Sequence, residues 1–373
     1  MDANLTHTWS SLKSVEDWIL KLGLLDADQF IASTSSGSLL SYSLSNASSR
    51  CLFKWEEAHE SSINDMKVID TNTFASCSTD GIKVWDVRVT AGGGNNLSTS
   101  LNNAKNSNFL SLAARGNLLA GGTELQSADA EVLVWDLRKA DQVVNLFVDS
   151  HQDDVTALEF HPSLEQYLMS GSTDGYTNIY DLSKPEEEDA LHQVINFGSV
   201  HSCHFITESR ISVLTHIETL MFHDLHDTNY EDLSSLQFVD VGDLRAQWPD
   251  NSYVIDLSPS GYVAFASTIT NKLSVMPFNP RKEKFKLDKV INFPQAHGDQ
   301  IVRDVLVLQD SRHALSCGED GAIKYWEFPR ELKRYSIGET TSPVEISPPV
   351  KKVSTKPHHQ NKKSRKDKRF KPY

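Results

Sequence analysis

A self-similar segment that occurs three times constrains this 373-residue chain more than any other feature. The three copies span His59–Asp86, His151–Asp181 and His297–Glu327. Each copy starts with histidine, continues through an apolar-alternating stretch and a run of small residues, and ends with an Asp-Gly pair and an aromatic residue followed by an acid. A repeat of this length cannot bury its apolar face alone, so neighbouring copies must stack and share a core.

Each copy predicts a small antiparallel sheet. Residues 155–160 show the period of two that is typical of a half-buried strand. The Asp-Gly pairs at 80–81, 174–175 and 320–321 lie between two strand-like runs, where a tight hairpin needs positive φ. Weaker copies fill the gaps and bring the count to seven sheets; they lie at 17–44, 109–138, 200–225 and 253–278.

These segments resemble WD repeats, a family that folds as β-propellers. The resemblance implies an all-β, seven-bladed propeller over residues 1–337, followed by a basic tail over 338–373 that lacks the apolar content to fold. Because a propeller must not leave a free sheet edge, a closing strand is expected at Leu5–Trp9, with Leu332–Ile337 as the alternative. The Gly-, Asn- and Ser-rich residues 90–107 predict a long loop between blades 2 and 3.

In WD-repeat proteins a buried hydrogen-bond chain joins a histidine, a hydroxyl, the turn aspartate and an aromatic residue. The resemblance places this chain on His59, Ser78, Asp80 and Trp85; on His151, Ser172, Asp174 and Tyr180; and on His297, Asp320 and Trp326. Gly318 stands at the third hydroxyl position, so the third chain is expected to lack a member. Tyr180 replaces the usual indole, and the three chains are expected to be weakened.

A narrower resemblance points to the family of WD repeat-containing protein 89 and its fungal and plant relatives. It is carried by residues 150–156, 160–163, 170–175, 243–245 and 301–303, together with the basic C-terminus. This family implies a nuclear or nucleolar protein without known chemistry, and ribosome production is suggested for its plant relatives.

The charge is divided unevenly along the chain. Residues 345–373 contain 10 Lys/Arg and 2 Asp/Glu, a balance of +8, whereas residues 1–344 contain 26 and 48, a balance of −22. An acidic body attracts basic proteins, and a basic tail serves nuclear import, contacts RNA phosphates, or does both. The tail residues that carry this prediction are Lys351, Lys352, Lys362, Lys363, Arg365, Lys366, Lys368 and Arg369.

Two interaction surfaces follow from the resemblance. WD-repeat proteins usually bind partners on the narrow top face, and the residue just inside the first strand of a blade points there. This rule selects Asn64, Thr156 and Arg303, with Arg245 as an addition; the alternative is that these arginines are solvated or paired within the ring.

The second surface comes from two WDxR motifs, at residues 85–88 and 135–138. In propellers that act as substrate receptors of cullin-4 ubiquitin ligases, the arginine of this motif helps to bind the adaptor. Arg88 and Arg138 are therefore candidate adaptor contacts, although the motif is also common in propellers without that role.

No motif indicates catalysis, a cofactor or a metal site. The chain has no P-loop, GxSxG or HExxH pattern. Five histidines around blade 5 include HxxH spacings, but residues three apart on a strand face opposite sides and chelate zinc poorly. These histidines are His201, His204, His216, His223 and His226.

Neither a secretory signal nor an apolar run long enough to span a membrane is present. The expected protein is a monomeric, non-enzymatic interaction scaffold of the nucleus or nucleolus. It supports ribosome biogenesis by binding a basic ribosomal or assembly protein, with a cullin-4 substrate receptor as the alternative.

Overall fold

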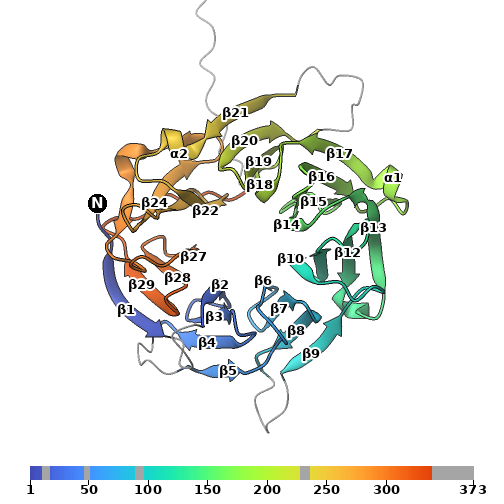
Figure 1. The fold of residues 1–373 in the computed structure, drawn as a ribbon, viewed down its shortest axis with the longest axis horizontal. Helices are drawn as coiled ribbons and strands as arrows, with labels where there is room; N and C mark the ends of the chain where they lie inside the picture. The colour runs from blue at the N-terminus through green and yellow to red at the C-terminus, as the bar shows by residue number, and fades with distance from the viewer. Residues whose placement is uncertain (11–16, 46–50, 89–95, 227–235, 338–373) are drawn as a thin grey trace, which may run out of the picture. The chain divides into compact units, whose positions relative to one another are not determined.

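Seven antiparallel sheets form a ring in a computed structural model of the protein (Figure 1). We call the axis of this ring, which the inner strands surround, the central channel. The predicted seven-bladed β-propeller is therefore confirmed. The basic tail predicted at 338–373 lies outside the described residues. The structure describes residues 1–10, 17–45, 51–88, 96–226 and 236–337.

In each of blades 1 to 5, four strands follow one another from the channel to the outer rim. Blades 1 and 2 contain β2 (Ile19–Leu24), β3 (Gln29–Thr34), β4 (Leu39–Ser43) and β5 (Phe53–Trp55), and β6 (Asp65–Val68), β7 (Thr73–Ser78), β8 (Gly81–Asp86) and β9 (Leu97–Leu101). Blades 3 and 4 contain β10 (Phe109–Arg115), β11 (Leu118–Thr123), β12 (Ala130–Asp136) and β13 (Val143–His151), and β14 (Val155–Phe160), β15 (Tyr167–Ser172), β16 (Tyr176–Asp181) and β17 (Leu191–Asn196). Blade 5 contains β18 (Val200–Thr207), β19 (Arg210–Thr215), β20 (Thr219–Asp224) and β21 (Phe238–Asp243).

Blades 6 and 7 depart from this simple order. In blade 6 both β25 and β26 pair with the third strand, and in blade 7 the outer strand comes from the N-terminus. The strands are β22 (Tyr253–Ser258), β23 (Tyr262–Ser267), β24 (Lys272–Asn279), β25 (Lys284–Phe285) and β26 (Ile291–Phe293), then β27 (Val302–Val307), β28 (His313–Gly318), β29 (Ala322–Glu327) and β1 (Asn4–Ser10). The short helices are η1 (Leu137–Lys139), α1 (Glu187–Ala190), α2 (Leu244–Gln247) and η3 (Leu287–Lys289). No helix among the described residues is long and apolar enough to cross a membrane.

The buried apolar side chains of the described residues form seven clusters, one between each pair of neighbouring blades. The cluster between blades 2 and 3, for example, packs Ile82 and Val84 against Phe109 and Trp135. The seven inner strands also contact one another around the whole channel. Each blade is therefore covered on both faces by its neighbours.

Strand β1 closes the ring. It pairs antiparallel with β29, with Asn4 opposite Glu327 and Trp9 opposite Ile323. Trp9 is buried and packs edge-on against Phe30 of blade 1, with ring centroids 5.1 Å apart. The first of the two closing strands predicted from the sequence, Leu5–Trp9, is thus confirmed.

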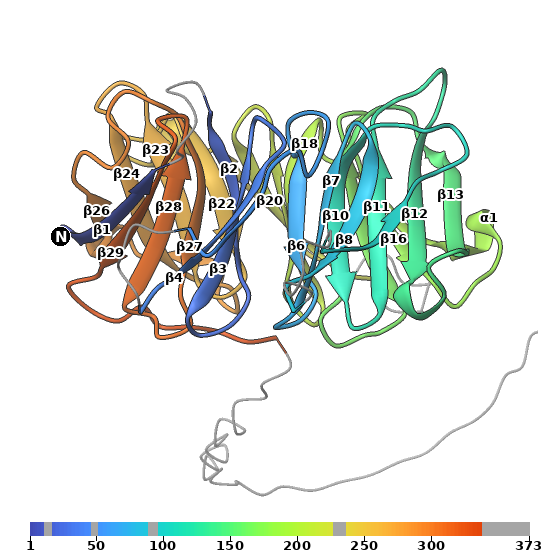
Figure 2. The ribbon, with the colours of Figure 1, turned by 90° about the horizontal axis from the view of Figure 1, so that it is seen from below.

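The alternative closing segment, Leu332–Ile337, is wrong as a strand prediction. We call the face with the turns between second and third strands the upper face, and the opposite face the lower face. Residues 328–337 run along the lower face from blade 7 (Figure 2). The Leu332 N–H donates to the Ser311 carbonyl and the Tyr335 N–H to the Ser260 carbonyl of blade 6, both at 2.9 Å. This segment forms a strap that links blade 7 to blade 6.

The loop predicted over residues 90–107 contains the outer strand of blade 2. Residues 97–101 form β9, in which Ile82 lies opposite Leu101 and Trp85 opposite Leu97. The low apolar content of this strand has a physical reason, because an outer strand buries little of its surface. The loop prediction from composition is therefore wrong for residues 97–101, which form a solvated outer strand.

The ring closure predicts a large effect for Trp9→Ala. Truncating a fully buried tryptophan lowers the free energy of unfolding by about 3–5 kcal/mol, and here it removes the contact that joins blade 7 to blade 1. Urea unfolding followed by circular dichroism measures this difference. Leu5→Ala on the same strand is the control, because Leu5 is exposed; equal effects of the two substitutions would contradict the closing role of Trp9.

Candidate functional site

Three blades contain the buried hydrogen-bond chain, and blade 2 shows its complete form. His59 Nδ1 lies 2.5 Å from Asp80 Oδ1, and His59 Nε2 lies 2.7 Å from Ser76 Oγ. The Trp85 indole N–H donates to the same hydroxyl at 2.8 Å. Because burial lowers the pKa of His59, its ring is neutral and can donate to the aspartate and accept from the serine.

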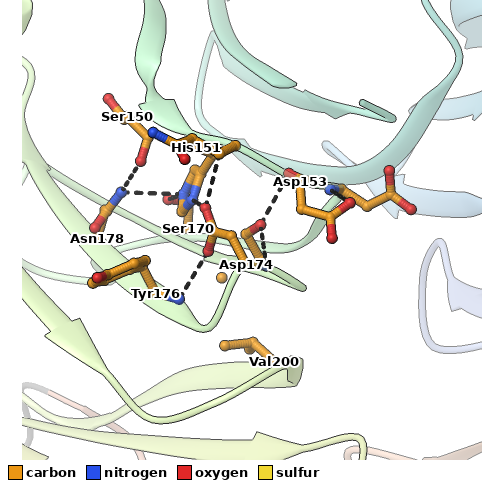
Figure 3. A network of polar contacts seen from close by, with 12 residues as sticks. Ser150, His151, Asp153, Ser170, Asp174, Tyr176, Asn178 and Val200 are labelled. Carbon is orange, nitrogen blue, oxygen red and sulfur yellow. Dashed lines mark hydrogen bonds and ion pairs between the residues drawn. The ribbon is translucent and has the colours of Figure 1, made fainter. Parts of the chain in front are cut away.

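Blades 4 and 7 repeat this arrangement. In blade 4, His151 contacts Asp174 at 2.9 Å and Ser170 at 2.7 Å, as Figure 3 shows, and Ser170 Oγ lies 3.3 Å from the Tyr180 hydroxyl. In blade 7 the contacts are His297 to Asp320 at 2.7 Å, His297 to Ser316 at 2.8 Å and Trp326 to Ser316 at 3.0 Å.

The prediction from sequence placed the hydroxyl of each hydrogen-bond chain two residues too far toward the C-terminus. Ser78 donates to the Ser62 carbonyl, and Ser172 donates to the Asp153 carbonyl, so both tie the loop before the inner strand. Blade 7 does not lack a hydroxyl at Gly318, because Ser316 supplies it. Residues two apart on a strand share a face, and the sequence does not show which of two serines lies beside the indole.

The upper opening of the channel is surrounded by seven residues at equivalent places, which we call the collar. In six blades the inner strand has a register shift at this place, and in blade 2 the residue immediately precedes β6. The collar consists of Leu20, Asn64, Leu110, Thr156, His201, Ile255 and Arg303.

Two of the predicted partner-binding residues turn inward and hold the ring together. The Asn64 side-chain amide donates to the Phe109 carbonyl of blade 3 at 2.8 Å, and the Thr156 hydroxyl donates to the Val200 carbonyl of blade 5 at 2.6 Å. Both side chains are half-buried. Their polar groups are therefore engaged between blades, and the prediction that they contact a partner gains no support from their geometry.

The two predicted arginines remain exposed on the upper face. Arg303 pairs with Glu319 and lies over the Trp18 ring, 5.7 Å from its centroid. Arg245 lies outside the collar, on α2, and its guanidinium donates hydrogen bonds to the Asp243 carboxylate. Collar residues missed by sequence reasoning are Leu20, Leu110, His201 and Ile255; counting from the start of each weak inner strand would have found them.

Directly below the collar lies a charged layer formed by Lys21, Asp65, Asp256 and Asp304. Asp304 accepts the Leu22 N–H of blade 1 at 2.8 Å. Burial disfavours the Lys21 ammonium, but the carboxylates of Asp65, Asp304 and Asp256 raise the pKa of Lys21. Burial raises the pKa of Asp304 despite Lys21. At Asp256 burial also disfavours the carboxylate, but the hydrogen bond from His204 and the nearby positive charges together lower the pKa of Asp256. Asp304 is therefore the carboxylate of this layer whose burial the neighbouring lysine does not fully offset.

His204 joins three blades beside the charged layer. Its Nδ1 lies 2.7 Å from Glu159 of blade 4, and its Nε2 lies 3.1 Å from Asp256 of blade 6. Burial opposes the imidazolium, yet the two carboxylates raise the pKa of His204 to about 10. His204 is therefore a charged clamp, whereas burial and His216 lower the pKa of His201 in the collar to about 4.

The WDxR arginines lie on the lower face and share one geometry. Asp86 binds Arg88 through Nε and Nη2, and Asp136 binds Arg138 in the same way. The hydrogen bonds from Arg138 lower the pKa of Asp136 to about 2. Each aspartate orients an exposed guanidinium at the end of a third strand, on adjacent blades 2 and 3.

The histidines around blade 5 belong to structural contacts. His223 Nδ1 donates to the Asp224 carbonyl at 2.7 Å, and His216 contacts Ser199. Among the described residues, no three His, Cys, Asp or Glu side chains are grouped to hold a metal ion.

Known proteins show similarity over the whole propeller. Residues 143–181 and 288–327 match the family model described as WD domain, G-beta repeat. The chain is 39% identical to an uncharacterized WD repeat-containing protein of Saccharomyces cerevisiae, YNL035C, over 96% of both chains. It is 27% identical to the WD repeat-containing protein 89 homolog of Dictyostelium discoideum, over 72% of both chains. It is 29% identical to the WD repeat-containing protein GTS1 of Arabidopsis thaliana, over 74% of this chain and 71% of the relative.

The buried chain predicts energetic coupling between Ser76 and Trp85. Ser76→Ala leaves His59 and the indole N–H without their partner and lowers the free energy of unfolding by about 1–3 kcal/mol. In a double-mutant cycle, Ser76→Ala and Trp85→Phe give less than the sum of their separate losses. Ser78→Ala with Trp85→Phe is the matched cycle and is additive; coupling to Ser78 instead would restore the assignment made from sequence.

The raised pKa of His204 predicts a loss of stability at alkaline pH. Its folded pKa of about 10 lies above the ordinary value of 6.5, so its contribution is complete below pH 6.5 and is lost as the pH rises toward 10. We expect His204→Gln to lower the free energy of unfolding by on the order of 3 kcal/mol at neutral pH, with the difference shrinking steadily as the pH rises toward 10. Denaturant unfolding at several pH values measures this, with His216→Gln as control; a pH-independent difference would contradict the clamp.

Proposed function

The chain belongs to the WD-repeat family of β-propellers, and from this we propose that it is a non-enzymatic interaction scaffold that binds a basic protein partner at the upper opening of its channel. WD-repeat propellers are in general protein-interaction scaffolds. The step from that general role to a basic partner rests on the collar and the charged layer beneath it.

The collar and the charged layer together suit a lysine or arginine side chain. Leu20, Leu110 and Ile255 offer apolar contact to the aliphatic stem of such a side chain. Below them, Asp304 provides a buried carboxylate that Lys21 does not fully compensate. This pairing of three apolar collar residues with the buried Asp304 carboxylate is the observation that carries the proposal.

We further propose that the protein works in the nucleus, or the nucleolus, in ribosome biogenesis. The balance of +8 over residues 345–373 supports nuclear import or RNA contact, and −22 over residues 1–344 supports a basic ribosomal or assembly protein as partner. The similarity to the WD repeat-containing protein 89 homolog bears out the narrower resemblance, and the nuclear role is what that resemblance implies.

A second candidate function is that of a cullin-4 substrate receptor. The observation in its favour is the identical presentation of Arg88 and Arg138 on adjacent blades of the lower face. This site and the upper opening lie on opposite faces, so substitutions can separate the two functions.

Affinity purification of the tagged full-length protein, followed by mass spectrometry and imaging, tests both candidates. We expect nuclear protein that recovers basic ribosomal or assembly proteins, loss of that recovery in Ile255→Lys, and cytoplasmic protein when residues 345–373 are removed. Val144→Lys on the outer strand β13 is the matched control, because Val144 is exposed far from the collar.

Recovery of a cullin-4 adaptor without ribosomal proteins, abolished by replacing Arg88 and Arg138 with alanine, would transfer the function to the second candidate. Recovery that Ile255→Lys and Val144→Lys leave equally intact would remove the upper opening from the proposal.

A further inference from the structure

We propose that the upper rim of blades 5 and 6 is a second docking surface, formed by Ile217, Arg245 and Ile269. Its partner is a protein segment in which a carboxylate lies between two apolar side chains. The surface lies outside the channel opening and requires the opposite charge in its partner, so it goes beyond the proposed function.

The two isoleucines are unusually exposed. Ile269 exposes 88% and Ile217 exposes 67% of its surface, the two highest values among the large apolar residues described. Single exposed apolar residues are ordinary and need no explanation. Here the two most exposed ones lie at the corresponding turns of adjacent blades, which is typical of an interaction site.

Folding does not require isoleucine at these turns. Ile217 occupies the turn position that Asp174 occupies in blade 4. Each of these residues directly precedes a residue with positive φ, which is Glu218 in blade 5 and Gly175 in blade 4. In blade 4 the aspartate is needed because His151 binds it. The turn aspartate and its histidine partner are both absent from blades 5 and 6. The residue at the turn tip therefore has no part in a buried hydrogen-bond chain there, and in both blades this tip bears an exposed isoleucine.

The surface is held rigid before any partner binds. The Glu218 carboxylate accepts the Val254 N–H at 2.8 Å, which fixes the blade 5 turn to blade 6. Arg245 Nη2 donates to the Ile217 carbonyl at 3.1 Å, and Arg245 Nε donates to Asp243 Oδ1 at 3.0 Å. A preorganised surface loses little conformational entropy on binding.

The charge of the partner follows from Arg245. Its side chain is 48% exposed, and among the described residues its Nη1 donates to no other atom. Arg245 and Ile269 line one cavity of about 410 Å³, whose Asp250 is already paired with Lys272 at 2.9 Å. The Nη1 group, which Asp243 and the Ile217 carbonyl leave free, can donate to a carboxylate oxygen. The two isoleucines suit apolar neighbours of that carboxylate.

A protein segment fits this surface better than a nucleic acid. Binding to a phosphate backbone uses several cations along a groove, whereas here one arginine contacts the Ile217 carbonyl and shares a cavity with Ile269. An exposed arginine beside exposed apolar side chains is typical of a binding hot spot.

Peptide display on the immobilised full-length protein tests the proposal, with a random 12-residue library as the probe. Selected peptides are then synthesised and their affinities measured by fluorescence anisotropy. We expect enrichment of Asp or Glu flanked by apolar residues. We also expect at least tenfold weaker binding to Arg245→Glu and to the double variant Ile217→Ser, Ile269→Ser.

Arg138→Glu is the matched control. On the lower face, Asp136 holds the Arg138 guanidinium in the same way as Asp243 holds Arg245 on the upper face. Binding should be unchanged in Arg138→Glu and in Ile255→Lys, which separates this surface from the channel opening. The proposal would be overturned if the display selected basic peptides, peptides whose binding does not depend on Arg245 and the isoleucines, or no peptides. Circular dichroism and melting curves verify that the variants keep the fold, including Ile255→Lys, whose site is half-buried against the cluster between blades 6 and 7.

Discussion

Every blade of this propeller buries its apolar residues against two neighbours, and the rest of the structure depends on that mutual cover. The seven buried clusters each lie between two blades, not within one. A blade without a neighbour would expose an apolar face, so an open ring would leave the two blades at its gap without cover. Closure by β1 is for this reason a condition of stability for the whole ring, since Trp9 contributes to the cluster between blades 7 and 1.

The same dependence explains the polar groups around the channel. Asn64 and Thr156 donate hydrogen bonds to carbonyl groups of the next blade. Asp65 and Asp304 accept hydrogen bonds from the Leu112 and Leu22 N–H groups of neighbouring blades. Buried polar groups of this kind stabilise only when they are satisfied, and the ring satisfies them through contacts between blades. What remains for a partner is the set of side chains not used in this way, the apolar collar residues and the exposed arginines.

Sequence reasoning predicted the fold because the repeat, the Asp-Gly turns and the alternation all indicate one architecture. It also identified His59, Asp80 and Trp85 correctly as neighbours, yet chose Ser78 where the structure uses Ser76. Both serines lie on the same face of one strand, and only the strand register decides between them. Sequence reasoning did not select Ile217, because blade 5 lacks the Asp-Gly pair that marks this turn in blades 2, 4 and 7.

The closing strand has a consequence for biosynthesis. Strand β1 pairs with β29, so the first strand made waits for residues 322–327 before it has a partner. At ordinary translation rates of about 5–20 residues per second, that delay is on the order of 15–60 s. During this time the apolar faces of blades 1 and 6 lack their final cover, and Trp9 is exposed to solvent or to a chaperone. The order of synthesis thus makes β1 the strand of the propeller that stays unpaired longest.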